Sequence, residues 1–290
     1  MVTAAIRSLL FTPGNHPGKV AKVFTVGADV AILDLEDAVA LSEKAATRAP
    51  VVEALKAPRE CLGYVRVNAT DTDFYSEDIS AVVGPWLDGI VLPKVENADQ
   101  LLSADADMRK LETANGVAPG TIDLIPILET AKGLAAVSEI AGCASRVRRL
   151  SFGAVDFAKD LGMRLSMDEW ELTPARSAIV LASRVAGLDA PLDSVWVHYR
   201  DNDGLVASAE RVRDMGFRGK MCIHPAQVAP VNDVFTPSDE DVAQAEKIVA
   251  AFEEAETQGS ASIQVNGVFV DYPVVEQARR TLELMKLIKG

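Results

Sequence analysis

The chain has 290 residues, 49% of them hydrophobic, and a formal net charge of −13 at pH 7. It is long enough to bury a full core, as one large α/β domain or as two smaller ones. Nucleic-acid affinity rests largely on lysine and arginine neutralising phosphates, so this acidic balance argues against a nucleic-acid partner. The composition favours an enzyme that acts on small molecules, or a carrier of cations.

The start of the chain and its cysteines indicate the cellular compartment. The first stretch, MVTAAIRSLLFTPG, is interrupted by Arg7 and Pro13 too early for a signal peptide, and no apolar run approaches membrane-spanning length. Cys61, Cys143 and Cys222 are widely separated and flanked by apolar or small residues, which is typical of reduced thiols. We therefore expect a cytoplasmic protein without a membrane partner.

Short runs rich in Val, Ile and Leu alternate with segments whose apolar residues return every three or four positions. The runs predict buried strands at 8–12, 30–35, 62–67, 89–92, 122–128, 147–152, 194–198 and 220–223. The segments between them predict helices, among them 18–26, 42–55, 98–112, 134–141, 173–186 and 204–215. Units of roughly 30 residues, each a strand followed by a helix, are typical of a parallel sheet covered by helices.

The number of these units favours an α/β protein with a closed (β/α)8 barrel, the TIM-barrel fold, over an open doubly wound sheet. A dinucleotide-binding sheet is also disfavoured, because the loop at 12–18 lacks the three-glycine spacing that admits a pyrophosphate. We expect the barrel to span residues 1–235.

The pattern changes after the last strand, so residues 236–290 are expected to form a C-terminal helical extension. Its predicted elements are a helix at 239–256, a hairpin around Asn266-Gly267 and a final helix at 274–288.

Barrel enzymes take their catalytic groups from the carboxyl ends of the strands, because the loops there converge on one mouth. Glu129 follows the fifth strand, and Asp156 comes shortly after the sixth. Two carboxylates on adjacent strand ends can share one ion, and their hard oxygen atoms suit Mg²⁺ or Mn²⁺. Glu129 is equally well explained as the N-cap or a first-turn acid of the following helix, and Asp156 as a helix N-cap.

Two other strand ends could bind a substrate anion. Arg66 would form a bidentate clamp for a carboxylate or an oxyanion, would bridge to Glu36 or Asp37, or would do both. Gly153 and Ala154 leave main-chain N–H groups at a helix start, where a substrate carboxylate could bind, although small residues in a tight turn explain them equally well.

The three histidines, His16, His198 and His224, show no two-histidine zinc spacing, which makes zinc hydrolysis improbable. The chain has no Gly-x-Ser-x-Gly elbow, which disfavours a serine hydrolase. His198 follows an apolar run, so we expect a histidine near the core rather than a catalytic base.

A series of segments in one order resembles the citrate lyase β-subunit-like family, also called the HpcH/HpaI aldolase superfamily, which includes malyl-CoA and citramalyl-CoA lyases. The segments are 7–15 (RSLLFTPGN), 33–39 (LDLEDAV), 65–68 (VRVN), 92–96 (LPKVE), 129–133 (ETAKG), 152–156 (FGAVD), 219–225 (GKMCIHP) and 270–273 (VDYP). Each segment is weak alone, but their common order is specific, and the match spans essentially the whole chain.

The resemblance implies a magnesium-dependent carbon–carbon lyase in which Glu129 and Asp156 bind Mg²⁺ and Arg66 contacts the substrate. It also implies that the C-terminal extension reaches the active site of a neighbouring subunit, in a homotrimer or a dimer of trimers. There Asp271 would act in proton transfer at the acetyl carbon.

Glu36 and Asp37 would orient Arg66 or water at the metal. Gly153, Ala154 and Val155 are the expected contacts of the substrate acid, and Val155 is apolar where relatives commonly carry an acid or an amide.

Members of this family bind CoA along the loop after the first strand. That makes Phe11, Pro13, Gly14, His16 and Lys22 candidates for contacts with the thioester arm and the phosphates. His16 occupies a position that is often arginine in the family.

The expected reaction is the cleavage of a 3-hydroxyacyl-CoA such as citramalyl-CoA or malyl-CoA to acetyl-CoA and a 2-oxo acid. Three alternatives stay open: a malyl-CoA thioesterase, a citrate lyase β subunit acting on citryl-acyl carrier protein, and a barrel without catalytic activity.

Overall fold

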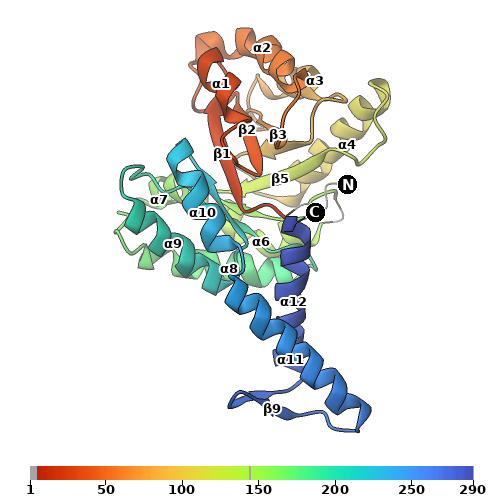
Figure 1. Ribbon diagram of the computed structural model, residues 1–290. Helices are drawn as coiled ribbons and strands as arrows, with labels where there is room; N and C mark the ends of the chain where they lie inside the picture. The colour runs from red at the N-terminus through yellow and green to blue at the C-terminus, as the bar shows by residue number, and fades with distance from the viewer. Residues whose placement is uncertain (1–4, 144, 290) are drawn as a thin grey trace. The chain divides into compact units, whose positions relative to one another are not determined.

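The computed structural model describes residues 5–143 and 145–289, which form two compact units, Ile6–Phe235 and the residues from Thr236 on. Within these residues, the first unit is a closed barrel of eight parallel strands in chain order (Figure 1). The strands are β1 (Ser8–Pro13), β2 (Val30–Asp34), β3 (Leu62–Arg66), β4 (Gly89–Leu92), β5 (Asp123–Leu128), β6 (Ser151–Phe152), β7 (Leu192–Asp193) and β8 (Gly219–Cys222). The predicted (β/α)8 architecture is confirmed.

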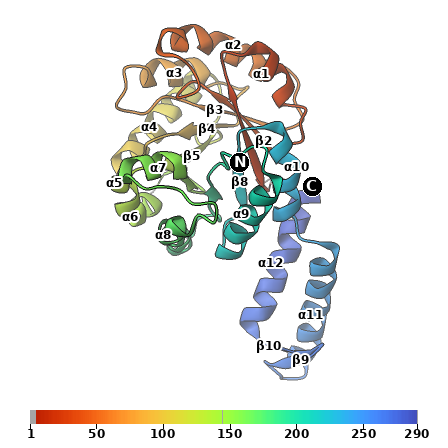
Figure 2. The ribbon, with the colours of Figure 1, turned by 90° about the vertical axis from the view of Figure 1, so that its left-hand side faces the viewer.

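Helices surround this barrel (Figure 2). They are α1 (Pro17–Val23), α2 (Lys44–Lys56), α3 (Tyr75–Val82), α4 (Ala98–Ala114), α5 (Ala131–Ala135), α6 (Val137–Gly142), α7 (Ala154–Leu161), α8 (Thr173–Val185), α9 (Asn202–Met215) and α10 (Val228–Phe235), with 3-10 turns η1 (Leu41–Glu43), η2 (Trp170–Leu172) and η3 (Pro225–Gln227). Thr130 caps α5 and Asp201 caps α9 through their side chains. The predicted helix at 134–141 is divided into α5 and α6.

The barrel strands are buried on both faces, which explains their nearly continuous apolar sequences. Leu9 and Ile32 belong to a cluster inside the barrel, whereas the adjacent Leu10 and Leu33 pack in the layer between barrel and helices. Successive side chains of a strand point to opposite faces, so each strand serves both layers.

The seventh strand is Leu192–Asp193, and the expected strand at 194–198 is wrong. The apolar run that suggested it is explained by Trp196, whose side chain is buried in the outer layer. The carbonyl of Trp196 accepts a hydrogen bond from Gln227 Nε2 at 2.8 Å. The Gln227 side chain therefore satisfies a carbonyl group that a neighbouring strand would satisfy in a sheet. His198 is the last residue of this segment and is exposed, which also corrects its expected place near the core.

The second unit contains α11 (Asp239–Thr257), an antiparallel hairpin of β9 (Ile263–Val265) and β10 (Val268–Val270), and α12 (Tyr272–Lys289). These elements match the predicted ones closely. Asn266 and Gly267 both have positive φ, at 50° and 82°, as a tight two-residue hairpin turn requires. In the part of the chain that the structure describes, no helix combines the length and apolar character needed to cross a bilayer.

Candidate active site

The carboxyl ends of β2 to β5 bring a row of charged side chains to one mouth of the barrel. Asp34 ends β2 and lies opposite Arg66, which ends β3, in the parallel register. Lys94 comes two residues after β4, and Glu129 comes directly after β5. Because these strands are parallel neighbours, the four side chains start from adjacent positions at the same end of the barrel.

Arg66 is bound by Asp34 through two hydrogen bonds, Nε to Oδ1 at 2.7 Å and Nη2 to Oδ2 at 2.6 Å. Its remaining nitrogen, Nη1, lies 3.0 Å from Glu36 Oε2. Burial alone would lower the pKa of the guanidinium, but the charges of Asp34 and Glu36 outweigh it and raise the pKa further above its ordinary value. Arg66 is therefore a permanent cation held in one position.

This arrangement refines the expected role of Arg66. The expected bridge to Glu36 is present, but Asp37 pairs instead with Lys94, at 3.6 Å between Nζ and Oδ1. The bidentate clamp is formed with Asp34, a residue that the sequence reasoning did not assign to the site. Arg66 thus supplies a fixed positive charge to the site, rather than a free pair of N–H groups for a bidentate contact with the substrate.

Glu129 is a buried acid, with 3% of its surface exposed. One carboxylate oxygen, Oε1, accepts a hydrogen bond from the main-chain N–H of Lys94 at 2.8 Å. Burial and the negative charges of Glu36 and Asp156 raise the pKa of Glu129 to about 8, against the opposing effects of Arg66 and the Lys94 N–H. The helix-cap explanation of Glu129 is wrong, because Thr130 occupies the cap position of α5.

Asp156 lies in the first turn of α7, close enough to Glu129 to affect its ionisation. The expected N-cap role of Asp156 is wrong, because Gly153 occupies the cap position of α7, although an acid in the first turn still stabilises the start of a helix. Gly153 makes the approach to Glu129 possible: a Cβ atom there would lie 2.5 Å from Glu129 Oε2. No larger residue fits at position 153 without moving the Glu129 carboxylate.

Glu129 and Asp156 suit a hard divalent cation chemically, because both offer carboxylate oxygens and the buried one lacks sufficient positive charge around it. Among the described residues, no group of three or more His, Cys, Asp and Glu side chains is arranged to hold a metal ion. A cation at this pair would therefore complete its coordination with water or substrate oxygens, as Mg²⁺ commonly does.

One of the main-chain N–H groups at the start of α7 is already used in a hydrogen bond within the protein. The main-chain N–H of Ala154, expected to bind a substrate carboxylate, donates to Ser194 Oγ at 2.8 Å in a buried position. Ser194 thereby anchors the helix that carries Asp156, and no sequence motif indicates this role. Val155 is 41% exposed.

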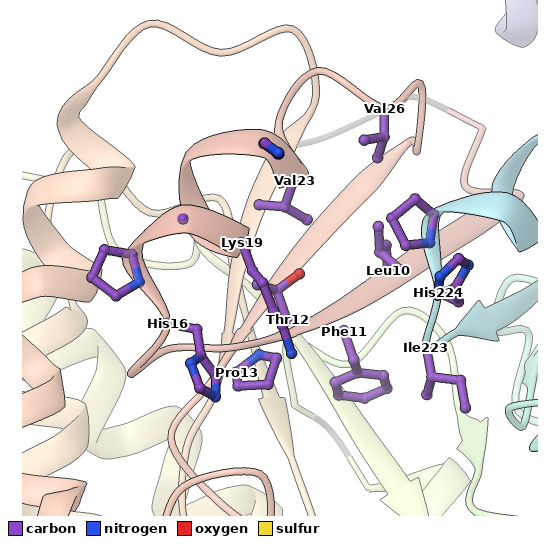
Figure 3. A pocket seen from close by; sticks show the side chains of 14 residues that line it. Leu10, Phe11, Thr12, Pro13, His16, Lys19, Val23, Val26, Ile223 and His224 are labelled. Carbon is purple, nitrogen blue, oxygen red and sulfur yellow. The ribbon is translucent and has the colours of Figure 1, made fainter.

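A pocket of about 590 Å³ lies between β1, α1 and the segment after β8 (Figure 3). Phe11, Pro13, His16 and Lys22 line it, four of the five residues expected to contact CoA. Sequence reasoning missed other lining residues, among them Lys19, Ile223 and His224. The pocket wall is mainly apolar, with lysines at α1, so it can accept a long apolar arm that carries anionic groups.

Gly14, the fifth expected contact, is buried below the pocket loop. A Cβ atom at Gly14 would lie 2.7 Å from Val51 and 2.8 Å from the Asp34 carbonyl, so only glycine fits. The Phe11 ring lies 4.8 Å from the centre of the Arg66 guanidinium and stacks as a cation–π pair. Phe11 therefore links the pocket to the charged mouth.

The histidines at the barrel mouth have structural partners. His224 Nδ1 accepts the main-chain N–H of Ala226 at 3.2 Å, which caps η3, and its ring stacks on Tyr199. The His198 ring lies against Trp196 with 5.4 Å between centroids.

Asp271 belongs to the second unit. It precedes α12, where its carbonyl accepts from Val275 N–H at 3.0 Å and its Oδ1 from Val274 N–H at 3.4 Å. Its expected action in a neighbouring subunit stays a prediction.

Residues 7–225 match the family described as HpcH/HpaI aldolase/citrate lyase. The chain belongs to this family. A citrate lyase subunit beta of Leuconostoc mesenteroides subsp. cremoris is 36% identical over 284 residues, covering 96% of this chain and 92% of that protein. An L-malyl-CoA/beta-methylmalyl-CoA lyase of Cereibacter sphaeroides (strain ATCC 17025 / ATH 2.4.3) is 36% identical over 309 residues, covering 98% and 96%.

A solved structure of the same type extends this family likeness to three dimensions. Protein CitE from Mycobacterium tuberculosis, in complex with magnesium, acetoacetate and coenzyme A, is 31% identical, with a TM-score of 0.79. The likeness covers 98% of this chain and 100% of that chain. The family resemblance and the barrel fold expected from the sequence are both confirmed.

Proposed function

We propose that this protein is a magnesium-dependent carbon–carbon lyase that cleaves a 3-hydroxyacyl-CoA of the citramalyl-CoA or malyl-CoA type to acetyl-CoA and a 2-oxo acid. The observation that carries this proposal is the pair of carboxylates at the barrel mouth, Glu129 directly after β5 and Asp156 in the first turn of α7, with the permanently charged Arg66 at the end of β3. The lyase names of full-length relatives support it, as does the CitE structure that holds magnesium and coenzyme A.

In this proposal Glu129 and Asp156 would hold the Mg²⁺ ion. When bound, the ion supplies positive charge to the oxygen atoms of the substrate carboxylate and hydroxyl group. Glu129 is presented by β5 and oriented by the Lys94 N–H, while Asp156 is presented by α7, which Ser194 anchors. Gly153, Ala154 and Val155 would border the substrate acid at this point.

Cleavage sends the electron pair of the breaking C–C bond into the acetyl thioester, which becomes an enolate. The hydroxyl group gives its proton to a water molecule and becomes the keto group of the 2-oxo acid, so the proton that the enolate takes up later balances the one lost here. A preorganised cation stabilises such developing negative charge best when it need not move. Arg66 meets that condition, since Asp34 and Glu36 hold its guanidinium in place.

The enolate then takes a proton on carbon to give acetyl-CoA. We assign this proton to Asp271 of a neighbouring subunit, in a homotrimer or a dimer of trimers. The C-terminal extension, residues 236–290, would thus complete an active site on the barrel of residues 1–235. Asp37 would act indirectly, through its pairing with Lys94.

The pocket beside β1 would hold CoA. Phe11 and Pro13 would pack against the apolar arm, and Lys22 and His16 would lie near the phosphates, which attract ammonium groups. Gly14 would shape the loop rather than contact the ligand. The cytoplasm fits this substrate and the free thiols of Cys61, Cys143 and Cys222.

A citrate lyase β subunit that acts on citryl-acyl carrier protein is the second candidate, and the relatives named citrate lyase subunit beta favour it. Malyl-CoA hydrolysis would use the same carboxylates with water as the attacking group.

The test incubates the purified protein with Mg²⁺, acetyl-CoA and either pyruvate or glyoxylate, and in parallel with malyl-CoA or with citryl-acyl carrier protein, and identifies the products by mass spectrometry. Formation of citramalyl-CoA or malyl-CoA, abolished by EDTA, is the expected result because lyases also catalyse the reverse reaction. Turnover with a carrier protein alone would replace the CoA proposal by the subunit one. Release of free CoA from malyl-CoA without acetyl-CoA would indicate a thioesterase, and inactivity with every substrate would contradict an enzymatic role.

A further inference from the structure

Lys94 has a left-handed backbone, with φ at 53°. Among the described residues, the other non-glycine residues with positive φ are Glu169 and Asn266. Asn266 lies in a hairpin turn that favours this conformation, but Lys94 lies at the barrel mouth. A lysine in this region is strained, and such strain persists only where surrounding contacts impose it.

Three carboxylates lie around Lys94, one at its main-chain amide and two at its ammonium group. Its main-chain N–H donates to Glu129 Oε1 at 2.8 Å. Its ammonium group donates to Glu36 Oε1 and lies 3.6 Å from Asp37 Oδ1. Glu36 and Glu129 are each 3% exposed, so both depend on protein groups rather than on bulk water.

The angle φ describes rotation about the N–Cα bond, so it determines where a side chain points relative to the N–H of the same residue. At Lys94 the left-handed value directs the N–H toward Glu129 while the side chain reaches Glu36.

We propose that Lys94 is a positioning residue of the active site, which holds Glu129 through its main-chain amide and Glu36 through its ammonium group. The left-handed backbone is the feature that lets one residue hold both. The inference rests on the proposed function, because Glu129 is there a ligand of Mg²⁺.

The two contacts have different consequences. Glu36 lies beside Arg66 Nη1 as well as Lys94, so the ammonium group keeps Glu36 where it supports the catalytic cation. The amide contact occupies Oε1 of Glu129 and leaves the other oxygen, Oε2, on the side of Gly153. Loss of the first contact should slow the reaction, and loss of the second should weaken metal binding.

The amide contact is tested by Mg²⁺ titration calorimetry on full-length Lys94→Gly, Lys94→Met and Lys94→Val. Glycine adopts positive φ freely and methionine keeps the side-chain length, so both should bind Mg²⁺ nearly as tightly as the unaltered protein. Valine is β-branched and resists positive φ, so its Kd for Mg²⁺ should rise about 10- to 100-fold. Lys56→Met is the control, because it removes an ammonium group that pairs with Glu53 on the surface of α2.

The ammonium contact is tested by combining Lys94→Met with Glu36→Gln. If the ammonium acts through Glu36, Lys94→Met lowers kcat about tenfold, and the double variant is no slower than Glu36→Gln alone. Losses that multiply would show that the ammonium acts elsewhere and would overturn this half of the inference.

Unchanged Mg²⁺ affinity in Lys94→Val overturns the amide half. If thermal melting shows that this variant does not fold, hydrogen exchange of the Lys94 amide decides instead: faster exchange in Glu129→Ala supports the contact, and equal exchange overturns it. Absence of Mg²⁺ binding in the unaltered protein overturns the proposed function together with the inference. Binding there, with no change in any Lys94 variant, overturns the inference alone.

Discussion

Asp34 binds the Arg66 guanidinium with both carboxylate oxygens while the same oxygens accept the main-chain N–H groups of Glu36, at 2.9 Å, and Ala38, at 3.1 Å. With 1% of its surface exposed, Asp34 joins the loop after β2 to the cation of the site. Asp34 thus holds both the loop after β2 and the Arg66 guanidinium in place, without itself having to contact the substrate.

Asp34→Asn should therefore lower both stability and activity. Breaking a buried charged pair costs about 3–5 kcal/mol of unfolding free energy, and the released Arg66 loses its orientation. Urea unfolding and kcat measure the two effects. The control is Asp29→Asn, which breaks a similar pair with Arg7, with hydrogen bonds of 2.7 Å and 3.0 Å. Arg7 directly precedes β1 and Asp29 directly precedes β2, so this pair lies at the amino ends of the strands. Asp29→Asn should reduce stability without reducing kcat, and full kcat in Asp34→Asn would contradict the positioning role.

Gly153→Ala should weaken Mg²⁺ binding and activity about 10- to 100-fold, because the new methyl group would lie 2.5 Å from Glu129 Oε2 and displace it. Titration calorimetry measures the affinity. Gly142→Ala in α6 is the matched control, since its Cβ atom would meet nothing within 4 Å. That variant should keep its affinity and gain about 0.5–1 kcal/mol of stability. Equal affinities in the two variants would show that Glu129 tolerates the methyl group.

Removal of either proposed ligand should abolish metal-dependent lysis. Glu129→Ala and Asp156→Ala each leave one carboxylate for the ion, so we expect at least about a 100-fold loss of kcat and no heat of Mg²⁺ binding. Glu96→Ala is the control, because Glu96 pairs with the exposed Lys132 at 2.9 Å. Unchanged rates in Glu129→Ala, or in EDTA, would remove the metal from the mechanism.

Asp193 should give the fold a dependence on acid pH. Burial alone would raise the pKa of its carboxyl group, but Lys220 and Arg176 hold the pKa below the ordinary value of 3.8. A carboxyl group with a lowered folded pKa stabilises the protein fully above its unfolded pKa, and this contribution is lost as pH falls through the folded pKa. Asp193→Asn should thus lower the free energy of unfolding by about 3–5 kcal/mol at pH 7. The difference in stability between this variant and the unaltered protein should become smaller below about pH 4.

Urea unfolding at pH 7 and pH 3.5 checks this expectation. Asp189→Asn is the control, because the Asp189 side chain is 47% exposed and its pair with Arg149 should contribute at most about 1 kcal/mol. If the unfolding free energies of the unaltered protein and of Asp193→Asn differ by the same amount at both pH values, the stabilising role of the ionised Asp193 is contradicted.

Asp271→Ala and Glu129→Ala should each be inactive, yet mixing them should restore activity if Asp271 acts in a neighbouring subunit. A mixed oligomer contains sites with an intact barrel from one chain and an intact extension from another. Co-expression followed by an assay of acetyl-CoA formation measures the restored rate. Inactivity of the mixture, with affinity capture of a tag on one variant showing that the other variant is bound to it, would place Asp271 in its own chain's site or outside the reaction.

The barrel could be predicted because its signals are local. The apolar runs around β1 to β5 and the helical periodicity between them lie within short windows, and parallel strands force their carboxyl ends to one mouth. Glu129 could be singled out in the same way, since it directly follows the apolar residues of β5. The short β7 was misplaced because the burial of Trp196 imitates a strand.

The sequence by itself determined the strand order, the family and the acids at the strand ends, because periodicity and motif order are properties of neighbouring residues. Only the tertiary structure decided that Asp34 rather than Asp37 binds Arg66, that Ser194 takes the Ala154 N–H, and that Lys94 adopts a left-handed backbone to reach two carboxylates. These choices depend on strand register and on the packing of segments dozens of residues apart, where several partners of equal chemistry compete and geometry selects one.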